Sequence, residues 1–316
     1  MDIDKLRALV NAHEQPRRKA LSSQLPQLKR GILLARRTHR SIKNYLNPKV
    51  TNKKSKTFFT HVIARHQSVL VRKLGDSDIN LQKEKITNLQ RACEDLNGVI
   101  IDPGNIFSLW HTIGQPTHKK GYVNGMLLSN GKVVPGIGGG LCQLSNFLCW
   151  IFMHADTKII ERYHHSMDVF PDSGRVLPFG SGATCLYNFV DLKIKNTSAE
   201  PLQLKIWVTE NHLKGQLVSP QSAEAKFSVF EAEHCFIKTP TKYFRYNEIS
   251  RAKKINGEEI SREKLFTNFA PVLYPITTEY LSKNNFTVVD IQPTTYKNLA
   301  PQEPQYLTPQ PLLQSK

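Results

Sequence analysis

The stretch Gly136-Ile137-Gly138-Gly139-Gly140-Leu141-Cys142-Gln143 joins a run of glycines to an apolar segment that continues to His154. Adjacent glycines let the backbone adopt positive φ angles and approach another group closely. The apolar segment 141–154 predicts a helix that begins directly after the loop. Such a helix start presents free N–H groups and the positive end of the helix dipole. The sequence therefore predicts a core element made of a glycine loop, a cysteine and a helix.

Elements on both sides of this stretch place the chain in the α+β class. Helices are expected at 25–46 and 78–96, and apolar β-type runs at 58–63 and 69–71. Short strands and turns dominate from residue 99 to about residue 220, with Asn130-Gly131 as a hairpin signal. We expect a helical N-terminal region followed by a β-rich domain. The boundaries are a basic helical extension (1–56), a main domain (57–280) and a mostly extended tail (281–316).

Positive charge is concentrated at the N-terminal end of the chain. Residues 1–75 hold 18 Lys and Arg against three acidic residues, so they carry +15 of the net charge of +17. Such a segment suits an anionic membrane surface, phosphorylated precursors or nucleic acid. The alternative is a solvated basic helix that keeps the protein soluble. Nucleic acid is the least favoured partner, because no recognised DNA- or RNA-reading motif accompanies the charge.

Cysteine usage and hydropathy bear on the compartment. The five cysteines are odd in number and not tightly paired, which favours free thiols in a reducing environment. No apolar run approaches the roughly 20 residues of a membrane helix. Charged residues interrupt the first 30 positions, so no signal-peptide core is expected. We expect a cytoplasmic protein and leave a peripheral association with the membrane open.

The glycine loop and Cys142 together have the parts of a thiol acyl-transfer site. A cysteine in the first turn of a helix has a lowered pKa, which favours the nucleophilic thiolate. Backbone N–H groups near Gly140 and Leu141 are candidates for an oxyanion hole. The alternative is that Cys142 is a small buried hydrophobe at a tight corner. The loop lacks the Lys-Ser/Thr ending of a P-loop, which argues against nucleotide hydrolysis.

A thiol nucleophile needs a base, and Glu161-Arg162-Tyr163-His164-His165-Ser166-Met167-Asp168 is the obvious source. A strand here would point His164 and His165 to opposite faces, so that only one faces Cys142. The alternative is one surface histidine and one core histidine. Candidates for the carboxylate that orients the base are Asp168, Asp172 and Asp191.

Two further hypotheses concern metal binding and a long loop. Zinc is disfavoured because no Cys-x-x-Cys or His-x-x-x-His spacing occurs, and we expect no metal or cofactor. Cys149, two helical turns after Cys142, is typical of a core residue. The loop 170–182 could cover the site and bring Arg175 to an anionic group of a substrate, or could be an ordinary surface loop.

Several motifs together resemble the VanW family, named from gene clusters for glycopeptide resistance. The resemblance covers about residues 57–275. Its hallmark is Gly138-Gly139-Gly140-Leu141-Cys142-Gln143-Leu144-Ser145, and the accompanying motifs are Leu81-Gln82, Pro103–Ser108, Glu161–Ser166, Asp191-Leu192 and Tyr246–Arg251. The chain looks like the compact, signal-less members. Extracellular relatives often carry an Asp where this chain has Gly182.

The resemblance implies L,D-transpeptidase-type chemistry on peptidoglycan peptides. It assigns Cys142 as the nucleophile and His165 as the general base, with His164 as the other histidine of the motif. The residues expected to contact substrate or support the site are Gly138, Gly139, Gly140, Gln143, Ser145, Arg162, Ser166, Arg175 and Asp191. The predicted function is a cell-wall-related thiol acyl transferase or hydrolase acting on peptide-bearing precursors. The alternative is a non-catalytic accessory protein that binds a cell-wall precursor or a resistance enzyme.

Overall fold

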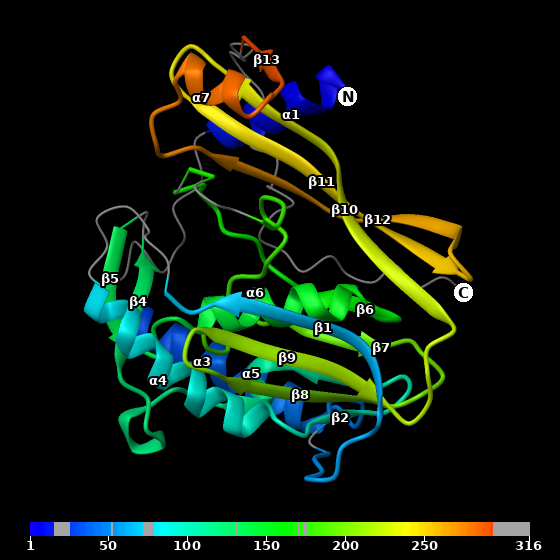
Figure 1. The fold of residues 1–316 in the computed structure, drawn as a ribbon. Coiled ribbons are helices and arrows are strands. Elements are labelled where there is room, and N and C mark those ends of the chain that lie inside the picture. Colours follow the sequence, from blue (N-terminus) through cyan, green and yellow to red (C-terminus); the bar gives the residue numbers. More distant parts are fainter. Residues whose placement is uncertain are drawn as a thin grey trace.

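The computed structural model of the chain describes residues 1–15, 26–51, 53–71, 79–129, 132–169, 171–172 and 176–292. N-terminal helices precede a β-rich body, which confirms the predicted α+β class (Figure 1). The helices are α1 (Ile3–Glu14), α3 (Pro26–Leu46), α4 (Ile79–Leu96), α5 (Leu109–Ile113), the 3-10 helix η1 (His118–Lys120), α6 (Leu141–Met153) and α7 (Thr278–Lys283).

The strands form four sheets. The first has the order β1-β9-β8-β2, and comprises β1 (His61–Val69), β9 (His212–Ser219), β8 (Leu202–Val208) and β2 (Ile100–Ile101). The second has the order β3-β7-β6, and comprises β3 (Ile106–Ser108), β7 (Lys193–Asn196) and β6 (Thr157–Glu161). The third is the hairpin of β4 (Asn124–Ser129) and β5 (Lys132–Ile137). The fourth has the order β12-β11-β10-β13, and comprises β12 (Glu258–Pro271), β11 (Tyr243–Ile255), β10 (Ala225–Lys238) and β13 (Val288–Asp290).

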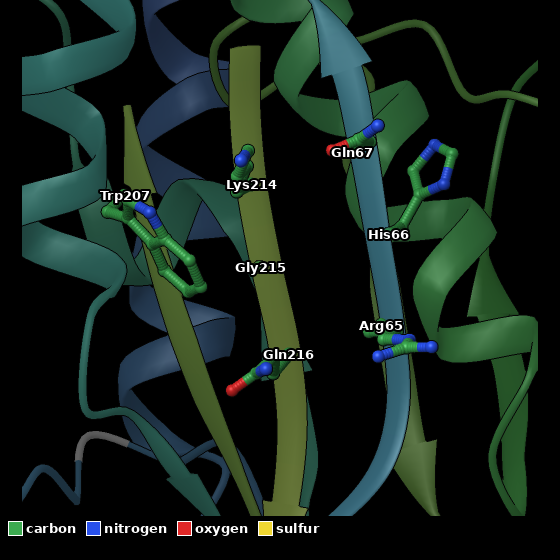
Figure 2. Close-up of a pocket in the computed structure, with 7 residues that line it drawn as sticks. All are labelled: Arg65, His66, Gln67, Trp207, Lys214, Gly215 and Gln216. Carbon is green, nitrogen blue, oxygen red and sulfur yellow. The ribbon is translucent and has the colours of Figure 1, made fainter. Parts of the chain in front are cut away.

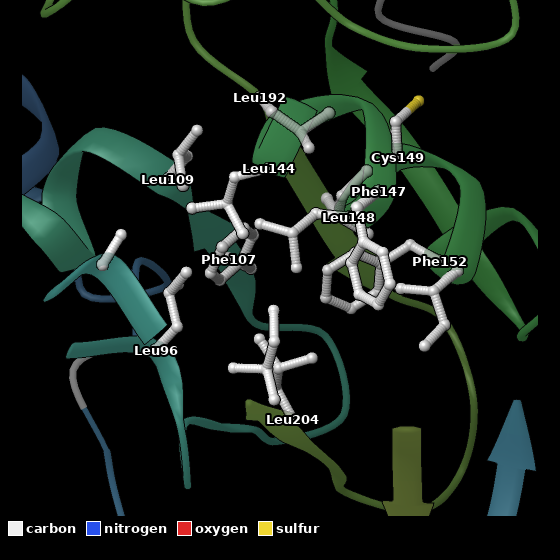
Figure 3. Close-up of a cluster of buried hydrophobic side chains, with 14 of the residues drawn as sticks. Leu96, Phe107, Leu109, Leu144, Phe147, Leu148, Cys149, Phe152, Leu192 and Leu204 are labelled. Atoms are coloured by element: carbon white, nitrogen blue, oxygen red, sulfur yellow. The ribbon is translucent and has the colours of Figure 1, made fainter. Parts of the chain in front are cut away.

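Helix α6 forms the centre of the main hydrophobic core. Nine of its thirteen residues are buried, so it is apolar on nearly every side and must be covered all round. Figure 3 shows Leu144, Leu148 and Phe152 among side chains from α4, β3 and β8. Figure 1 shows the helix lying between the first sheet and the long strands of the fourth. The predicted helix at 141–154 is therefore the element around which the fold is packed.

The far end of α6 is held by β11. Arg251 is buried and donates hydrogen bonds to the carbonyl oxygens of Met153 (3.3 Å), Ala155 (2.9 Å) and Thr157 (3.2 Å). A cation suits this position, because carbonyl groups at a helix C-terminus lack partners within the helix. The bonds fix the C-terminal end of α6, and hence the direction in which its N-terminal turn points.

The N-terminal helices pack on the folded body. Leu6 and Val10 of α1 are buried in a second core beneath β10, β11 and β12, with Phe244 and Phe269 stacked at 4.8 Å. Lys5 also donates to the Tyr246 hydroxyl (2.7 Å). α3 is attached differently, by polar contacts described below. None of the helices in the described ranges is long and apolar enough to cross a lipid bilayer.

The helices expected at 25–46, 78–96 and 141–154 and the hairpin are present, whereas two of the expected strand regions differ. Residues 61–63 and 69 of the apolar runs expected at 58–63 and 69–71 belong to one edge strand, β1, which continues through the polar residues between them. The strand expected through 161–168 ends at Glu161, and only an isolated bridge of Tyr163 to Thr184 continues it. The fraying predicted from Gln302 onward concerns residues outside the described ranges. The hairpin signal Asn130-Gly131 also lies outside them.

Candidate cysteine site

The glycine loop is shaped by close backbone packing against the β4–β5 hairpin. Gly138 and Gly140 have positive φ angles of 75° and 97°, as the sequence predicts. Gly139 has a steric requirement instead, because a Cβ atom there would lie 2.1 Å from the Gly125 carbonyl carbon. The buried Asn88 of α4 donates to the carbonyl oxygens of Gly139 (2.8 Å) and Val123 (3.0 Å). Loop and hairpin are thus fastened together beneath the start of α6.

The N–H groups of the loop donate to carbonyl oxygens of the loop itself and of the adjoining residues 123–126. Gly139 donates to the Gly136 carbonyl (2.9 Å), Gly140 to the Met126 carbonyl (2.9 Å) and Leu141 to the Gly138 carbonyl (3.3 Å). The expectation that Gly140 and Leu141 supply an oxyanion hole is therefore not met in this arrangement. Among the described residues, no backbone carbonyl of the loop accepts from the Cys142 N–H, so that group is the remaining donor at the helix start.

Cys142 lies in the first turn of α6 and is partly exposed. Its sulfur is 3.8 Å from the Thr184 hydroxyl and 3.8 Å from the Cys185 carbonyl oxygen. The Cys185 thiol donates to it across 4.0 Å. The sequence positions are more than 40 residues apart, and the fold brings them together at the head of the helix. The thiol therefore faces a hydroxyl, a backbone carbonyl and a second thiol, and its partial exposure differs from the buried hydrophobe considered as the alternative.

The surroundings of Cys142 favour its thiolate. The hydrogen bond from the Cys185 thiol, together with the positive charge of His165, lowers the pKa of Cys142 below its usual value despite burial. The pKa of Cys185 is raised in turn, because it gives its proton to the Cys142 sulfur and is itself desolvated. Burial also raises the pKa of Cys149, and raises those of Cys93 and Cys235 to about 12. Cys142 is the only one of the five thiols with a lowered pKa.

The two histidines have different surroundings. His165 is close enough to Cys142 for its charge to act on the thiol. His164 has its Nδ1 atom 2.7 Å from the His165 carbonyl oxygen, and burial lowers the pKa of His164. The strand that was expected to separate them ends at Glu161, before either histidine. His164 thus has a backbone contact, whereas the charge of His165 acts on the thiol.

The three candidate orienting carboxylates have other partners. Asp191 is fully buried and accepts from the Ser108 hydroxyl (2.6 Å) and from the N–H groups of Trp110 (3.1 Å) and Leu192 (2.9 Å). Burial raises the pKa of Asp191 to about 6. Its hydrogen bonds hold the start of α5, not an imidazole.

Asp168 and Asp172 lie at the fourth sheet. Arg245 donates to Asp168 (3.3 Å) and, with both terminal nitrogens, to Asp172, the bond from Nη1 measuring 2.9 Å. Asp168 also accepts from the Tyr274 hydroxyl (2.8 Å). These contacts attach the segment that follows the two histidines to β11.

Other predicted site residues hold the segments around the thiol. Gln143 donates to Ser68 (2.9 Å) and to the Val69 carbonyl (2.7 Å), which joins the head of α6 to the end of β1. Ser145 donates to the carbonyl oxygens of Cys142 (3.1 Å) and Ala183. Both side chains therefore position the helix and the 183–185 segment relative to each other.

Arg162 braces the same segment from the other side. Its guanidinium donates to the carbonyl oxygens of Gly182 (2.8 Å) and Gly180, and to Asn268 (3.1 Å), and lies 3.5 Å from the centre of the Phe266 ring. With these partners it acts on the site through the 180–182 backbone. Ser166 is exposed, and Arg175 lies outside the described residues.

Thr184, Cys185 and Asn146 also belong to the site, although none of them was predicted to lie beside the thiol. A Cβ atom at Gly182 would lie 2.1 Å from the Asn146 side-chain oxygen, so this asparagine fills the space that a side chain at position 182 would need. Its oxygen is buried without a hydrogen-bond partner. The sequence could have indicated Asn146, because it lies four residues after Cys142 and residues with this spacing share one face of a helix.

A separate open pocket of about 550 Å³ lies on the first sheet. Figure 2 shows Trp207, Lys214 and Gln216 on the neighbouring strands β8 and β9, with Arg65 and Gln67 on β1. His66 and Gly215 complete the lining, and no residue of the cysteine site contributes to it. Within the described ranges, no three His, Cys, Asp or Glu side chains gather closely enough to hold a metal ion.

Comparisons with known proteins agree with the motifs. The family described as VanW like protein matches residues 84–218. The vancomycin B-type resistance protein VanW of Enterococcus faecalis (strain ATCC 700802 / V583) is 29% identical over 201 residues, covering 63% of this chain and 73% of that protein. The uncharacterized protein YoaR of Bacillus subtilis (strain 168) is 26% identical over 123 residues, or 39% of either protein. No solved structure is significantly similar to the chain.

The matched segment includes most of α4, the glycine loop, Cys142, both histidines and the 183–185 wall of the site. Residues 84–218 of the chain are therefore similar to the family of VanW-like proteins.

Proposed function

We propose that the protein is a thiol-dependent acyl transferase or hydrolase that acts on peptide-bearing cell-wall precursors. The observation that carries the proposal is the position of Cys142 in the first turn of α6, where the Cys185 thiol donates to its sulfur across 4.0 Å and the Thr184 hydroxyl lies 3.8 Å away. This arrangement lowers the pKa of Cys142, whereas burial raises the pKa values of Cys93, Cys149 and Cys235. The name of the Enterococcus faecalis relative, a vancomycin resistance protein, supports a role connected with the cell wall. Vancomycin resistance is accordingly the proposed biological setting.

The proposed reaction follows the chemistry of the two side chains. The Cys142 thiolate adds to a stem-peptide carbonyl, and the tetrahedral intermediate collapses to a thioester while His165 gives its proton to the departing amine. The neutral His165 then takes a proton from an incoming amine or water, which attacks the thioester and releases the thiolate. The Cys142 N–H is the proposed first donor to the oxyanion.

Selective alkylation tests this proposal. At pH 6.5 an ordinary thiol is only about 1% thiolate, whereas Cys142 remains largely ionised, so iodoacetamide should label it at least about tenfold faster than any other cysteine after allowing for its weaker intrinsic nucleophilicity. Peptide mapping at several reaction times measures the five rates. Equal or slower labelling of Cys142 would remove the chemical basis of the proposal.

His165→Gln should move the alkylation profile of Cys142 to higher pH. The imidazolium charge lowers the pKa of the thiol, so its removal leaves less thiolate near pH 6 and an unchanged rate near pH 9. His164→Gln is the matched control, because it removes the neighbouring imidazole, whose pKa is lowered by burial and whose Nδ1 contacts the His165 carbonyl. The same stopped-time mapping gives both profiles. Identical shifts in the two variants would mean that His165 is not the charge partner.

A second candidate function is a non-catalytic accessory protein that binds a cell-wall precursor or a resistance enzyme. The observation that favours it is the hydrogen bonding of the loop, in which Gly140 and Leu141 already donate to carbonyls. A binding protein needs no oxyanion hole. Rapid alkylation of Cys142 without any acyl transfer would select this alternative.

The exposed face of α3 supports a proposed association with an anionic membrane surface. Arg40 pairs with Glu161, and Lys193 donates to the buried Asn44 (2.7 Å), which fixes one side of the helix. The opposite side exposes large apolar side chains, with 67% of Leu34 and 79% of Tyr45 accessible, beside exposed basic residues. Apolar residues flanked by cations are typical of helices that lie in a lipid interface. The remaining members of this surface are Arg36, His39, Ile42, Lys43 and Leu46.

We expect the protein to sediment with vesicles of phosphatidylglycerol and to remain unbound with phosphatidylcholine alone, because basic residues gain from anionic headgroups. Leu34→Glu with Tyr45→Glu should abolish sedimentation. Val176→Glu is the matched control, since Val176 is an exposed apolar residue that is not part of α3. Binding that survives the double substitution, or that ignores lipid charge, would rule out this surface.

A further inference from the structure

A second thiol lies directly against Cys142. The two sulfur atoms are 4.0 Å apart, and the Cys185 thiol donates to the Cys142 sulfur. The backbone carbonyl of Cys185 is also within 3.8 Å of that sulfur, so the whole residue faces the head of α6. The proposed acyl transfer uses the Cys185 thiol only as a hydrogen-bond donor and leaves its own reactivity unassigned.

The backbone around Cys185 suits a closer approach of the sulfurs. A disulfide has an S–S length of about 2.05 Å, so the sulfurs must approach each other by about 2 Å. Cys185 belongs to no helix or strand, and lies between the isolated bridges Tyr163–Thr184 and Leu186–Val190. Cys142 is in a first helical turn, where rotation about its Cα–Cβ bond moves the sulfur without disturbing the helix. Small side-chain movements, with a limited shift of an irregular segment, can join the two.

We propose that Cys142 and Cys185 form an oxidisable pair that closes to an intramolecular disulfide when the reduced protein meets a peroxide. This modification site is proposed from the distance between the two sulfurs and does not depend on the proposed function. Its consequence, reversible loss of the thiol chemistry of Cys142, rests on the proposed function.

The oxidation balances with hydrogen peroxide as the oxidant. The Cys142 thiolate attacks one peroxide oxygen, the O–O bond breaks, and Cys142 becomes a sulfenic acid while hydroxide leaves. The Cys185 sulfur then attacks the sulfenic sulfur, the S–O bond breaks, and the thiol proton and the departing hydroxide leave as water. Two thiols lose two electrons and two protons, and one peroxide becomes two waters. A dithiol reductant reverses the bond by two exchange steps.

The ionisation of the two sulfurs supports this order of events. Cys142 is the attacking thiolate, since its pKa is lowered by the Cys185 hydrogen bond and by His165. Cys185 retains its proton until the sulfenic acid forms, and it is already in contact with the sulfur that it must attack. Cys93, Cys149 and Cys235 are buried, so they are expected to keep their thiols.

The test treats the full reduced chain with hydrogen peroxide, blocks remaining thiols with N-ethylmaleimide under denaturing conditions and maps the peptides. We expect the five thiols to fall to three, with one cross-linked peptide joining Cys142 to Cys185, and recovery of all five with dithiothreitol. In Cys185→Ser, Cys142 should accumulate as a sulfenic acid that dimedone traps. Cys149→Ala, a change on the same helix, should leave the cross-link unchanged.

Retention of five thiols, a link between other cysteines, or a wild-type Cys142 that proceeds to sulfinic acid without the cross-link would each overturn the proposal. Acyl transfer by the reduced chain is measured separately. A protein that forms the cross-link but transfers no acyl group contradicts the proposed function and leaves the disulfide standing. A protein that transfers acyl groups but never forms the cross-link contradicts the disulfide and leaves the proposed function standing.

Discussion

We expect replacement of Cys142 by serine to abolish the proposed transfer from a synthetic peptidoglycan stem pentapeptide, with a loss of at least about 1000-fold in kcat/KM. A serine hydroxyl near neutral pH is scarcely ionised, and the hydrogen bond from Cys185 with the charge of His165 cannot make it a comparable nucleophile. Mass spectrometry of the released and transferred peptides measures the rate. The loss should occur without a change in Tm of more than about 2 °C, because the replacement is nearly isosteric.

Cys149→Ser is the matched control for this prediction. It makes the same change two turns along α6, where burial raises the pKa of the thiol and the residue belongs to the core. The control should lower stability by about 1 kcal/mol, because it buries a hydroxyl, and should retain transfer. Transfer that survives Cys142→Ser, or that falls equally in both variants, would show that the reaction does not depend on the site thiol.

We expect Gly139→Ala to lower the free energy of unfolding by about 3 kcal/mol or more. The added methyl carbon would lie 2.1 Å from the Gly125 carbonyl carbon and 2.2 Å from its oxygen. Both neighbours are backbone atoms, so relief requires that the β4–β5 hairpin separate from the loop and from its Asn88 contacts. Urea unfolding followed by circular dichroism measures the change in the free energy of unfolding.

Gly31→Ala is the matched control for the glycine prediction. Gly31 lies in α3 and a Cβ atom there meets nothing within 4 Å, so alanine should be neutral or should stabilise the helix by up to about 1 kcal/mol. The loop variant should also slow the alkylation of Cys142, since the helix start moves with the loop. Equal stability of the two alanine variants would contradict the close packing of loop and hairpin.

The central part of the site was predictable because its determinants are local. A glycine run followed by an apolar segment indicates a helix start, and α6 begins at Leu141 as expected, with Gly138 and Gly140 at positive φ. The amphipathic patterns of α3 and α4 were equally local. The requirement for glycine at position 139 could not be predicted from the local sequence, because it comes from the backbone of Gly125, which the β4–β5 hairpin places against Gly139.

The other wall of the site was not predictable from local pattern. Thr184 and Cys185 belong to the 162–192 segment, whose described residues form isolated bridges and no helix or strand, so no periodicity marks which side chains face α6. The long strand β12 was missed for a related reason. Its first seven residues, Glu258 to Lys264, are exposed on both faces, and the alternation that identifies a half-buried strand is therefore absent.

The orienting carboxylates show where motif-based inference exceeded the physical evidence. Asp191 follows the histidine motif in the family pattern, and its acidity suggested a triad. The structure gives its oxygens to Ser108, Trp110 and Leu192. Asn146, which no acid–base pattern would select, instead occupies the space beside Gly182.

The most direct test of the central claim is capture of the acyl enzyme. The reduced full chain is mixed with the stem pentapeptide, quenched in acid, where thioesters are stable, and analysed by intact mass spectrometry and peptide mapping. We predict a transient adduct on Cys142 that disappears on addition of an amine acceptor. If Cys142 is alkylated rapidly and yet never carries the acyl group, the thiolate is not a transfer nucleophile, and the accessory-protein alternative replaces the enzyme.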